Sequence, residues 1–136
     1  MKILILCTGN SCRSQMGEAF LNNMDGIIAF SAGTNPSKRV HPLAIKVMQE
    51  EGIDISNNNP KNSDGFISDS FDYVITVCDN AKESCPIFTG DVRKQLHIGF
   101  EDPDEVEGSD EFILSEFRRI RDEIKIAFDE FIESVK

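Results

Sequence analysis

The sequence predicts an α/β fold with a mainly parallel sheet, in a single domain that spans residues 1–136. Short apolar, β-branched runs alternate with helical patterns along the chain, which is typical of parallel strands joined by right-handed crossovers. The length suits one domain. No linker, internal repeat or low-complexity stretch divides the chain.

Each element is indicated by its own pattern. The first strand, residues 3–6, is a continuous apolar run, as expected of a strand buried on both faces of a sheet. Further strands are predicted at 27–31, 73–77 and 96–100, and helices at 14–23, 42–51 and 113–135, with a short helix at 63–70. The last helix has the clearest signal, because apolar residues recur at steps of three and four from Ile113 to Val135.

Composition argues against several classes of partner. The 14 Lys and Arg residues against 24 Asp and Glu leave a formal net charge of −10, which repels nucleic acids and anionic membranes. The apolar runs are too short to span a membrane, and the N-terminus does not resemble a signal peptide. We therefore expect a soluble, cytoplasmic, monomeric protein with no nucleic-acid or membrane partner.

Four cysteines, Cys7, Cys12, Cys78 and Cys85, carry the first chemical signal. In a cytoplasmic protein, cysteines are kept as thiols for redox, nucleophilic or metal chemistry rather than as structural disulfides. No pair has the C-x-x-C spacing of a zinc site or a thioredoxin motif, and there are only two histidines. We predict no metal site.

Chemical groups gather where three predicted strands end. The segment 7–14 follows the first strand, Cys78 and Asp79 follow the third, and Glu101-Asp102-Pro103 follows the fourth. Ligands of open parallel sheets bind beyond the carboxyl ends of the strands. We therefore expect these three segments to form one site.

The segment 7–14 has the pattern of an anion-binding loop with a nucleophile. Five residues separate Cys7 from Arg13, and a turn of this length wraps backbone N–H groups around one tetrahedral oxyanion. These donors, the Arg13 guanidinium and the Ser14 hydroxyl are expected to lower the Cys7 pKa and make Cys7 a nucleophile. Without a function, Cys7 would be a buried strand-end residue and Arg13 a surface charge. The predicted oxyanion-binding residues are Thr8, Gly9, Asn10, Ser11, Cys12 and Arg13.

The chain resembles the low-molecular-weight tyrosine phosphatase superfamily at three motifs: Cys7-Thr8-Gly9-Asn10-Ser11-Cys12-Arg13-Ser14-Gln15-Met16, Ser31-Ala32-Gly33 and Glu101-Asp102-Pro103. Within it, the chain is most similar to the thioredoxin-coupled arsenate reductases, and further similar segments lie at 53–57, 78–87 and 121–125. The resemblance runs nearly end to end. It implies a four-stranded parallel sheet flanked by helices, and reduction of arsenate to arsenite with thioredoxin as reductant and no bound cofactor.

The resemblance also implies a role for three cysteines. Cys7 attacks arsenic, Cys78 attacks Cys7 to form a Cys7–Cys78 disulfide as arsenite leaves, and Cys85 then forms a Cys78–Cys85 disulfide that thioredoxin reduces. If residues 78–85 are helical, the outer thiols lie two turns or about 10 Å apart, so the segment must unwind to bring their Cα atoms within about 7 Å. For Cys12, inside the loop, we expect a packing role.

Asp102 is the candidate general acid, because a carboxyl group beside the anion loop can protonate the oxygen that leaves the oxyanion. Asp102-Pro103 would otherwise be a plain turn. The phosphatases of the superfamily commonly have tyrosine after this Asp-Pro pair, whereas Asp104 stands here. An acidic residue suits recognition of a phosphotyrosine ring poorly.

One departure from the superfamily concerns a cation. Some members bind potassium through an Asn, a Glu, a Ser and an Asp. Asn10, Glu18 and Ser31 match the first three, but Lys61 stands where the Asp would be. The ammonium group of Lys61 can take the position of the cation, so we expect weak or absent potassium dependence.

Two other functions remain open. The first is a low-molecular-weight tyrosine or aryl phosphatase with Cys7 as nucleophile, as a main or a side activity. The second is a redox sensor or metal-binding regulator that uses the cysteines as a switch. That hypothesis leaves Arg13, Ser14 and Asp102 without a task.

Overall fold

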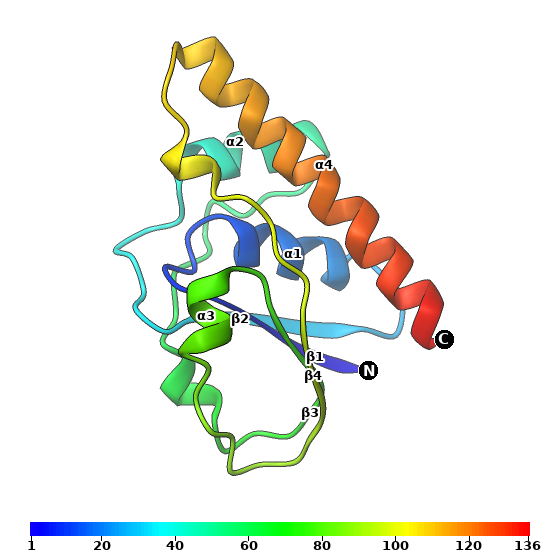
Figure 1. Ribbon diagram of the computed structural model, residues 1–136. Helices are drawn as coiled ribbons and strands as arrows, with labels where there is room; N and C mark the ends of the chain where they lie inside the picture. Colours follow the sequence, from blue (N-terminus) through cyan, green and yellow to red (C-terminus); the bar gives the residue numbers. More distant parts are fainter.

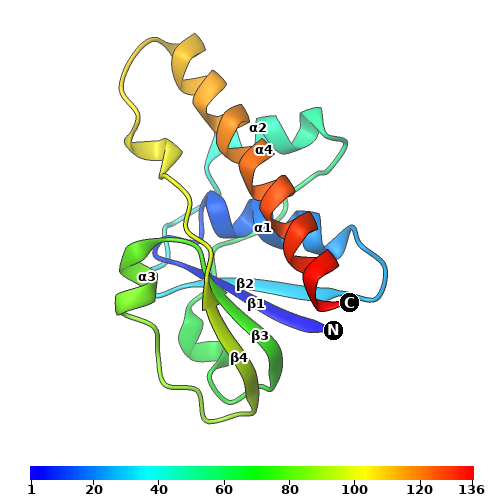
Figure 2. The ribbon, with the colours of Figure 1, turned by 45° about the vertical axis from the view of Figure 1, so that its right-hand side comes forward.

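A computed structural model of the protein describes residues 1–136, apart from the side chain of Asn80. Its four strands form one parallel sheet in the order β2-β1-β3-β4 (Figure 2), which confirms the predicted fold class. The strands are β1 (Lys2–Cys7), β2 (Ile28–Gly33), β3 (Phe71–Thr76) and β4 (Val92–His97); the helices are α1 (Arg13–Asn22), α2 (Pro42–Glu50), α3 (Asp79–Glu83) and α4 (Asp110–Val135), with 3-10 turns at Ser63–Phe66 and Pro103–Glu105.

β1 forms the centre of the sheet because its residues are apolar on both faces. Ile3, Leu4, Ile5 and Leu6 are completely buried, and β1 pairs with β2 on one side and with β3 on the other. Full burial of such side chains contributes about 1.5–3 kcal/mol each. The carboxyl end of β1 therefore delivers Cys7 to a fixed place.

α4 covers one face of the sheet together with α1, and it packs against α1 and α2 (Figure 1). Its predicted apolar stripe is confirmed, and Phe117, Ile124 and Phe128 are completely buried. The helix begins at Asp110, earlier than predicted, because the Ser109 hydroxyl caps it by accepting an N–H of the first turn. Among the described residues, no helix combines the length and the apolarity needed to cross a membrane.

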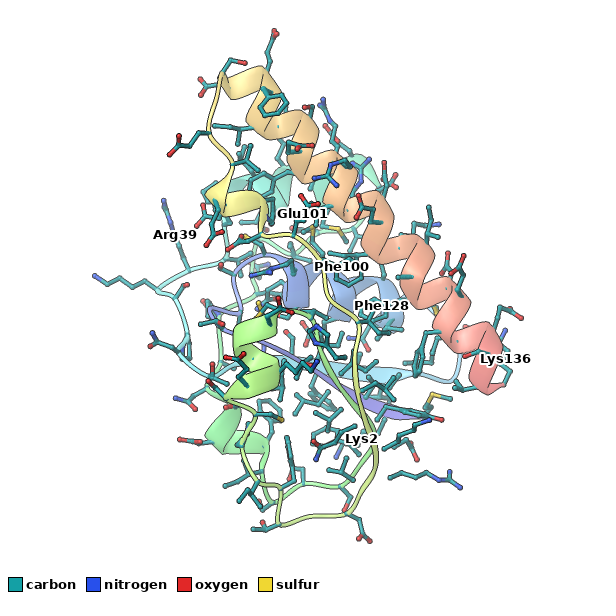
Figure 3. The ribbon with its side chains drawn as sticks, viewed as in Figure 1. Lys2, Arg39, Phe100, Glu101, Phe128 and Lys136 are labelled. Atoms are coloured by element: carbon teal, nitrogen blue, oxygen red, sulfur yellow. The ribbon has the colours of Figure 1, made fainter. Side chains whose placement is uncertain are left out.

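The fourth strand lies at Val92–His97, and the predicted position, residues 96–100, is wrong. β4 is at the edge of the sheet, so the side chains at 93–95 are exposed and polar and give no apolar signal. The apolar run that suggested a strand lies mostly beyond β4 and fills space beside α4. There, Phe100 packs against Phe128, with ring centroids 6.1 Å apart (Figure 3).

Two other boundaries differ from the prediction. β3 begins at Phe71 rather than at residue 73, because Phe71 already pairs with Val92 of β4. The predicted helix at 63–70 is only a 3-10 turn at Ser63–Phe66. Gly, Ser and Asp residues in this segment are weak helix formers, so the 3-10 helix ends after one turn.

β2 ends at Gly33, whose missing side chain lets the loop after β1 pass close by. A Cβ atom at Gly33 would collide with the carbonyl oxygen of Thr8. The Gly33 N–H donates to the Lys61 carbonyl at 2.7 Å, so the strand end cannot move away freely. Only glycine fits between these two segments.

We expect Gly33→Ala to lower the free energy of unfolding by about 1–3 kcal/mol, because the new methyl group forces Thr8 away from β2. Gly65→Ala is the matched control, since a Cβ atom at Gly65 meets nothing within 4 Å. Chemical denaturation of both variants measures the difference. Equal stability of the two would contradict the close approach.

Candidate active site

The three predicted segments meet at the carboxyl ends of the strands and line one cavity of about 830 Å³. The loop after β1, the start of α3 and the segment after β4 form its walls. Of the predicted site residues, Asn10 and Ser14 are completely buried rather than in the wall, and Cys85 lies outside the cavity. The lining residues are Cys7, Thr8, Gly9, Ser11, Cys12, Arg13, Asn35, Ser37, Cys78, Asp79, Gly99, Phe100, Glu101, Asp102, Asp104 and Glu105.

Asn10 holds the loop in shape from inside. Its backbone is in the left-handed region, with φ 52°, which asparagine adopts more readily than most residues. Its Nδ2 donates to Ser14 Oγ at 2.7 Å, and its Oδ1 accepts from the Lys61 N–H at 2.9 Å and from Gln15 Nε2 at 3.2 Å. Because Asn10 is completely buried, these bonds are shielded from water and fix the loop.

The hydrogen bond that the structure shows for the Ser14 hydroxyl goes to Asn10. A bond from Ser14 to Cys7 therefore stays a prediction. A support that the sequence analysis missed is Gln15, which is completely buried. Its amide donates to the Asn10 carbonyl at 3.1 Å and accepts from Asn58 at 3.2 Å. The sequence offered one signal of this role, a glutamine on the buried side of a helix.

Arg13 lies in the cavity wall with 11% of its side chain exposed. Its Nη1 donates to the Phe100 carbonyl at 3.0 Å, and its Nη2 lies 3.4 Å from Asp102 Oδ2. Among the described groups, its buried Nε has no hydrogen-bond partner. The segment after β4, which carries Phe100 and Glu101 (Figure 3), therefore fixes the guanidinium and leaves it a donor for an anion.

Cys7 and Cys78 line the same cavity, and each thiol changes the pKa of the other. The Cys78 sulfur also accepts from the Ala81 N–H at 3.4 Å and lies 3.3 Å from the Thr8 hydroxyl oxygen. The Cys7 hydrogen bond, the Thr8 and Ala81 donors and the charge of Arg13 together lower the pKa of Cys78 to about 5. The two thiols therefore share one negative charge at neutral pH.

For Cys7, the neighbouring Cys78 thiol and burial oppose the predicted lowering of the pKa, and their effect is to raise it. The hydrogen bond to Cys78 and burial of the sulfur raise it, and they outweigh the Arg13 charge and the Thr8 backbone donor that lower it. Two thiolates side by side in a buried site repel each other, so the pair keeps one proton. The two sulfurs share that proton.

Cys85 lies outside the cavity, beyond the end of α3 at Glu83, so the expected spacing of two helical turns does not apply. Its half-buried thiol donates to Gln95 Oε1 of β4 at 3.9 Å, and burial raises its pKa. All four cysteines are free thiols. Because Cys78 and Cys85 line different cavities, a disulfide between them requires the intervening segment to rearrange.

Cys12 is a buried thiol of the loop. Its sulfur lies 3.7 Å from the Ser11 hydroxyl oxygen, and burial raises its pKa to about 12. Cys12 is therefore protonated at neutral pH and much less reactive than a thiolate.

Glu18 and Ser31 are neighbours behind the loop. The Glu18 carboxylate accepts the Ser31 N–H at 3.1 Å, and burial raises the Glu18 pKa while the charge of Lys61 lowers it. The Lys61 ammonium donates to the Asn59 carbonyl at 3.3 Å. The positive charge of Lys61 thus acts on the Glu18 carboxylate.

A family model described as low molecular weight phosphotyrosine protein phosphatase matches residues 2–136. The chain belongs to this family. It is similar to the arsenate reductase of Bacillus subtilis (strain 168), 40% identical over 136 residues that cover 98% of this chain and 96% of the relative. These matches confirm the resemblance found in the sequence.

Solved structures of the family show the same fold. An arsenate reductase in the phosphate binding state is 32% identical with a TM-score of 0.77, and the match covers 99% of this chain and 98% of that one. A thioredoxin-dependent arsenate reductase from Corynebacterium glutamicum is 28% identical with a TM-score of 0.65, over 98% of this chain and 62% of that one.

We expect Cys78→Ala to lower the pKa of Cys7, because the hydrogen bond that raises it most is lost while Arg13 and the loop N–H remain. The pH dependence of alkylation by iodoacetamide, with Cys7 identified by peptide mass spectrometry, measures this. Cys7 should react at lower pH in the variant than in the wild type. Cys85→Ala, which leaves the pair intact, is the control. An unchanged or higher Cys7 pKa in Cys78→Ala would rule out the shared charge.

Proposed function

We propose that this protein reduces arsenate to arsenite and is then restored by thioredoxin. The observation that carries the proposal is that two thiols, Cys7 and Cys78, line one cavity beside an anion-binding loop. Reduction of As(V) to As(III) takes two electrons, which two adjacent thiols supply when they form a disulfide. Similar proteins named arsenate reductases support the proposal.

Arsenate binds in the loop between Cys7 and Arg13. Its tetrahedral oxygens accept from the loop N–H groups and from the guanidinium, including the buried Nε that lacks a partner among the described groups. Phosphate has the same shape and charge, and a similar arsenate reductase is known in a phosphate binding state. The similarity between phosphate and arsenate supports an oxyanion as the substrate.

In the first step, the Cys7 sulfur attacks arsenic and an S–As bond forms. The proton that the two thiols share then rests on the Cys78 sulfur. Arsenate arrives partly protonated. Asp102, which contacts Arg13, takes one of these protons and delivers it to the leaving oxygen. One arsenic–oxygen bond breaks, and the oxygen leaves as water.

In the second step, the Cys78 sulfur attacks Cys7. The S–As bond breaks and its electron pair stays on arsenic, which is reduced and leaves as arsenite. The proton on Cys78 passes to an arsenite oxygen, and the two sulfurs are oxidised to a disulfide. The Ala81 N–H and the Thr8 hydroxyl stabilise the attacking Cys78 thiolate.

In the third step, Cys85 attacks Cys78 and releases Cys7. The segment between them must rearrange, and α3 spans only five residues. A contact of 3.2 Å between His97 Nε2 and Asp79 Oδ1 ties α3 to β4, but Asp79 is exposed, so this contact resists little. Thioredoxin then reduces the Cys78–Cys85 disulfide, as the name of a similar thioredoxin-dependent reductase supports. We place the protein in the cytoplasm, where reductants keep thiols free, as a monomer.

A phosphatase activity with Cys7 as nucleophile is the second candidate, and membership of a phosphatase family favours it. Such a reaction needs Cys7 and Asp102 but neither Cys78 nor Cys85 as an electron donor. Asp104 lines the cavity and would place a carboxylate beside an aromatic substrate ring. We therefore expect phosphate release only as a side activity.

A coupled assay with arsenate, thioredoxin, thioredoxin reductase and NADPH tests the proposal. We expect repeated turnovers in the wild type, none in Cys7→Ser, and a trapped Cys7–Cys78 disulfide with at most one turnover in Cys85→Ser. Ser84→Ala, beside Cys85, is the matched control. Repeated turnovers in Cys85→Ser would refute the relay, whereas phosphate release from an aryl phosphate without any arsenite formation would favour the phosphatase.

We also propose that the protein needs no potassium ion behind the loop. Asn10 Oδ1 already accepts two hydrogen bonds, and the charge of Lys61 acts on Glu18, so a cation there would meet a like charge. We expect equal melting temperatures in potassium and sodium chloride. Lys61→Asp should create selective stabilisation by potassium. Strong selective stabilisation of the wild type by potassium would overturn the proposal.

A further inference from the structure

His41 lies outside the oxyanion loop but contacts the elements around it. Its Nδ1 accepts the Leu43 N–H at 3.1 Å and caps α2, and its ring packs on Phe117 of α4, with ring centroids 4.7 Å apart. Its backbone N–H donates to the Ser11 carbonyl of the loop at 2.9 Å. The ring position is therefore fixed relative to the anion-binding loop.

The fixed ring presents a donor to the segment after β4. Because Nδ1 accepts a hydrogen bond, the neutral ring carries its proton on Nε2. That nitrogen lies 2.9 Å from Asp104 Oδ1 and donates to it. Arg39 is exposed and lines a shallow cavity together with His41 and Asp104 (Figure 3), but the side-chain contact that the structure shows for Asp104 is the one with His41.

Asp104 in turn orients the candidate general acid. Its backbone N–H donates to Asp102 Oδ1 at 2.9 Å, while Asp102 Oδ2 lies 3.4 Å from Arg13 Nη2. Each oxygen of the Asp102 carboxyl group thus has its own partner. If the Asp104 side chain loses its anchor, the turn at Pro103–Glu105 is held only by its own backbone hydrogen bonds and by the Asp102 cap, and the carboxyl group of Asp102 can turn more easily.

We propose that His41, acting through Asp104, is a positioning residue that holds the Asp102 carboxyl group over the oxyanion loop. This inference rests on the proposed function, in which Asp102 protonates the leaving oxygen. His41 bonds to the loop through its backbone and to Asp104 through its ring. One residue therefore fixes the position of the acid relative to the oxyanion loop. The turn at Pro103–Glu105 is short and carries two acidic residues beside Asp102. The hydrogen bond from His41 to Asp104 offsets the repulsion between these carboxylates.

Asp104→Ala tests the anchor in single-turnover arsenite formation. We expect the rate to fall about 10- to 100-fold, because a small displacement of a catalytic group has an effect of this size. The dissociation constant for phosphate should not rise, since the loop and Arg13 are intact and a negative charge is lost from the cavity wall. His41→Asn, which keeps a side chain able to cap α2 but is too short for Asp104, should show the same split.

Two controls separate positioning from lost charge or lost stability. Asp104→Asn keeps an acceptor for His41 Nε2 and should retain most of the rate. Glu107→Ala removes an equal charge from the same exposed segment and should leave the rate unchanged. Thermal unfolding of each variant checks that it folds. Equal rates for Asp104→Ala and Glu107→Ala, or a rate for Asp104→Asn as low as for Asp104→Ala, would overturn the inference.

Asp102→Asn distinguishes failure of the inference from failure of the proposed function. If Asp102 is the acid, this variant is slow, and adding Asp104→Ala to it causes no further loss, because the two residues act as a unit. A further full loss in the double variant would overturn only the positioning role. Normal arsenite formation by Asp102→Asn would remove the acid step itself, and no arsenite from the wild type would remove the proposed function.

Discussion

The conformation of the anion loop depends on one buried side chain, Asn10. Its left-handed backbone turns the chain between β1 and α1, and its amide joins the loop to α1 and to the segment at Lys61. Among the described side chains, none caps the N-terminus of α1. The first N–H groups of this helix therefore remain available to an anion, at the end where the helix dipole is positive. The direction of the loop N–H groups and the placement of Arg13 follow from this turn, whereas β1 sets the position of Cys7.

The charge of the site is concentrated on sulfur. Burial alone would keep both thiols protonated, but several donors converge on Cys78 and the charge of Arg13 acts on both sulfurs, so the pair loses one proton. The two sulfurs share the remaining proton, because two adjacent thiolates would repel each other. A site built in this way holds its second nucleophile ready beside the first, and it links proton transfer between the two sulfurs to bond formation at the oxyanion. That coupling is the physical basis of the proposed two-electron reduction.

The sequence was sufficient for the features that depend on local pattern. Burial of β1, the apolar stripe of α4 and the convergence of three strand ends follow from periodicity and from the geometry of parallel sheets. The sequence was not sufficient for features that depend on the surrounding three-dimensional structure. β4 is a polar edge strand with no apolar signal. The Cys7 pKa depends on Cys78, a residue 71 positions away along the chain, and the contact of His41 with Asp104 spans 63 positions. No local pattern encodes such pairs.

The central claim is that the two electrons come from Cys7 and Cys78 and that the oxidation ends on Cys78 and Cys85. The most direct test mixes fully reduced protein with one equivalent of arsenate, without thioredoxin, and then counts thiols and maps disulfides. The account predicts one arsenite per protein, loss of two of the four thiols, and a Cys78–Cys85 disulfide. Arsenite formed with all four thiols still free, or with a disulfide that excludes Cys78, would contradict it.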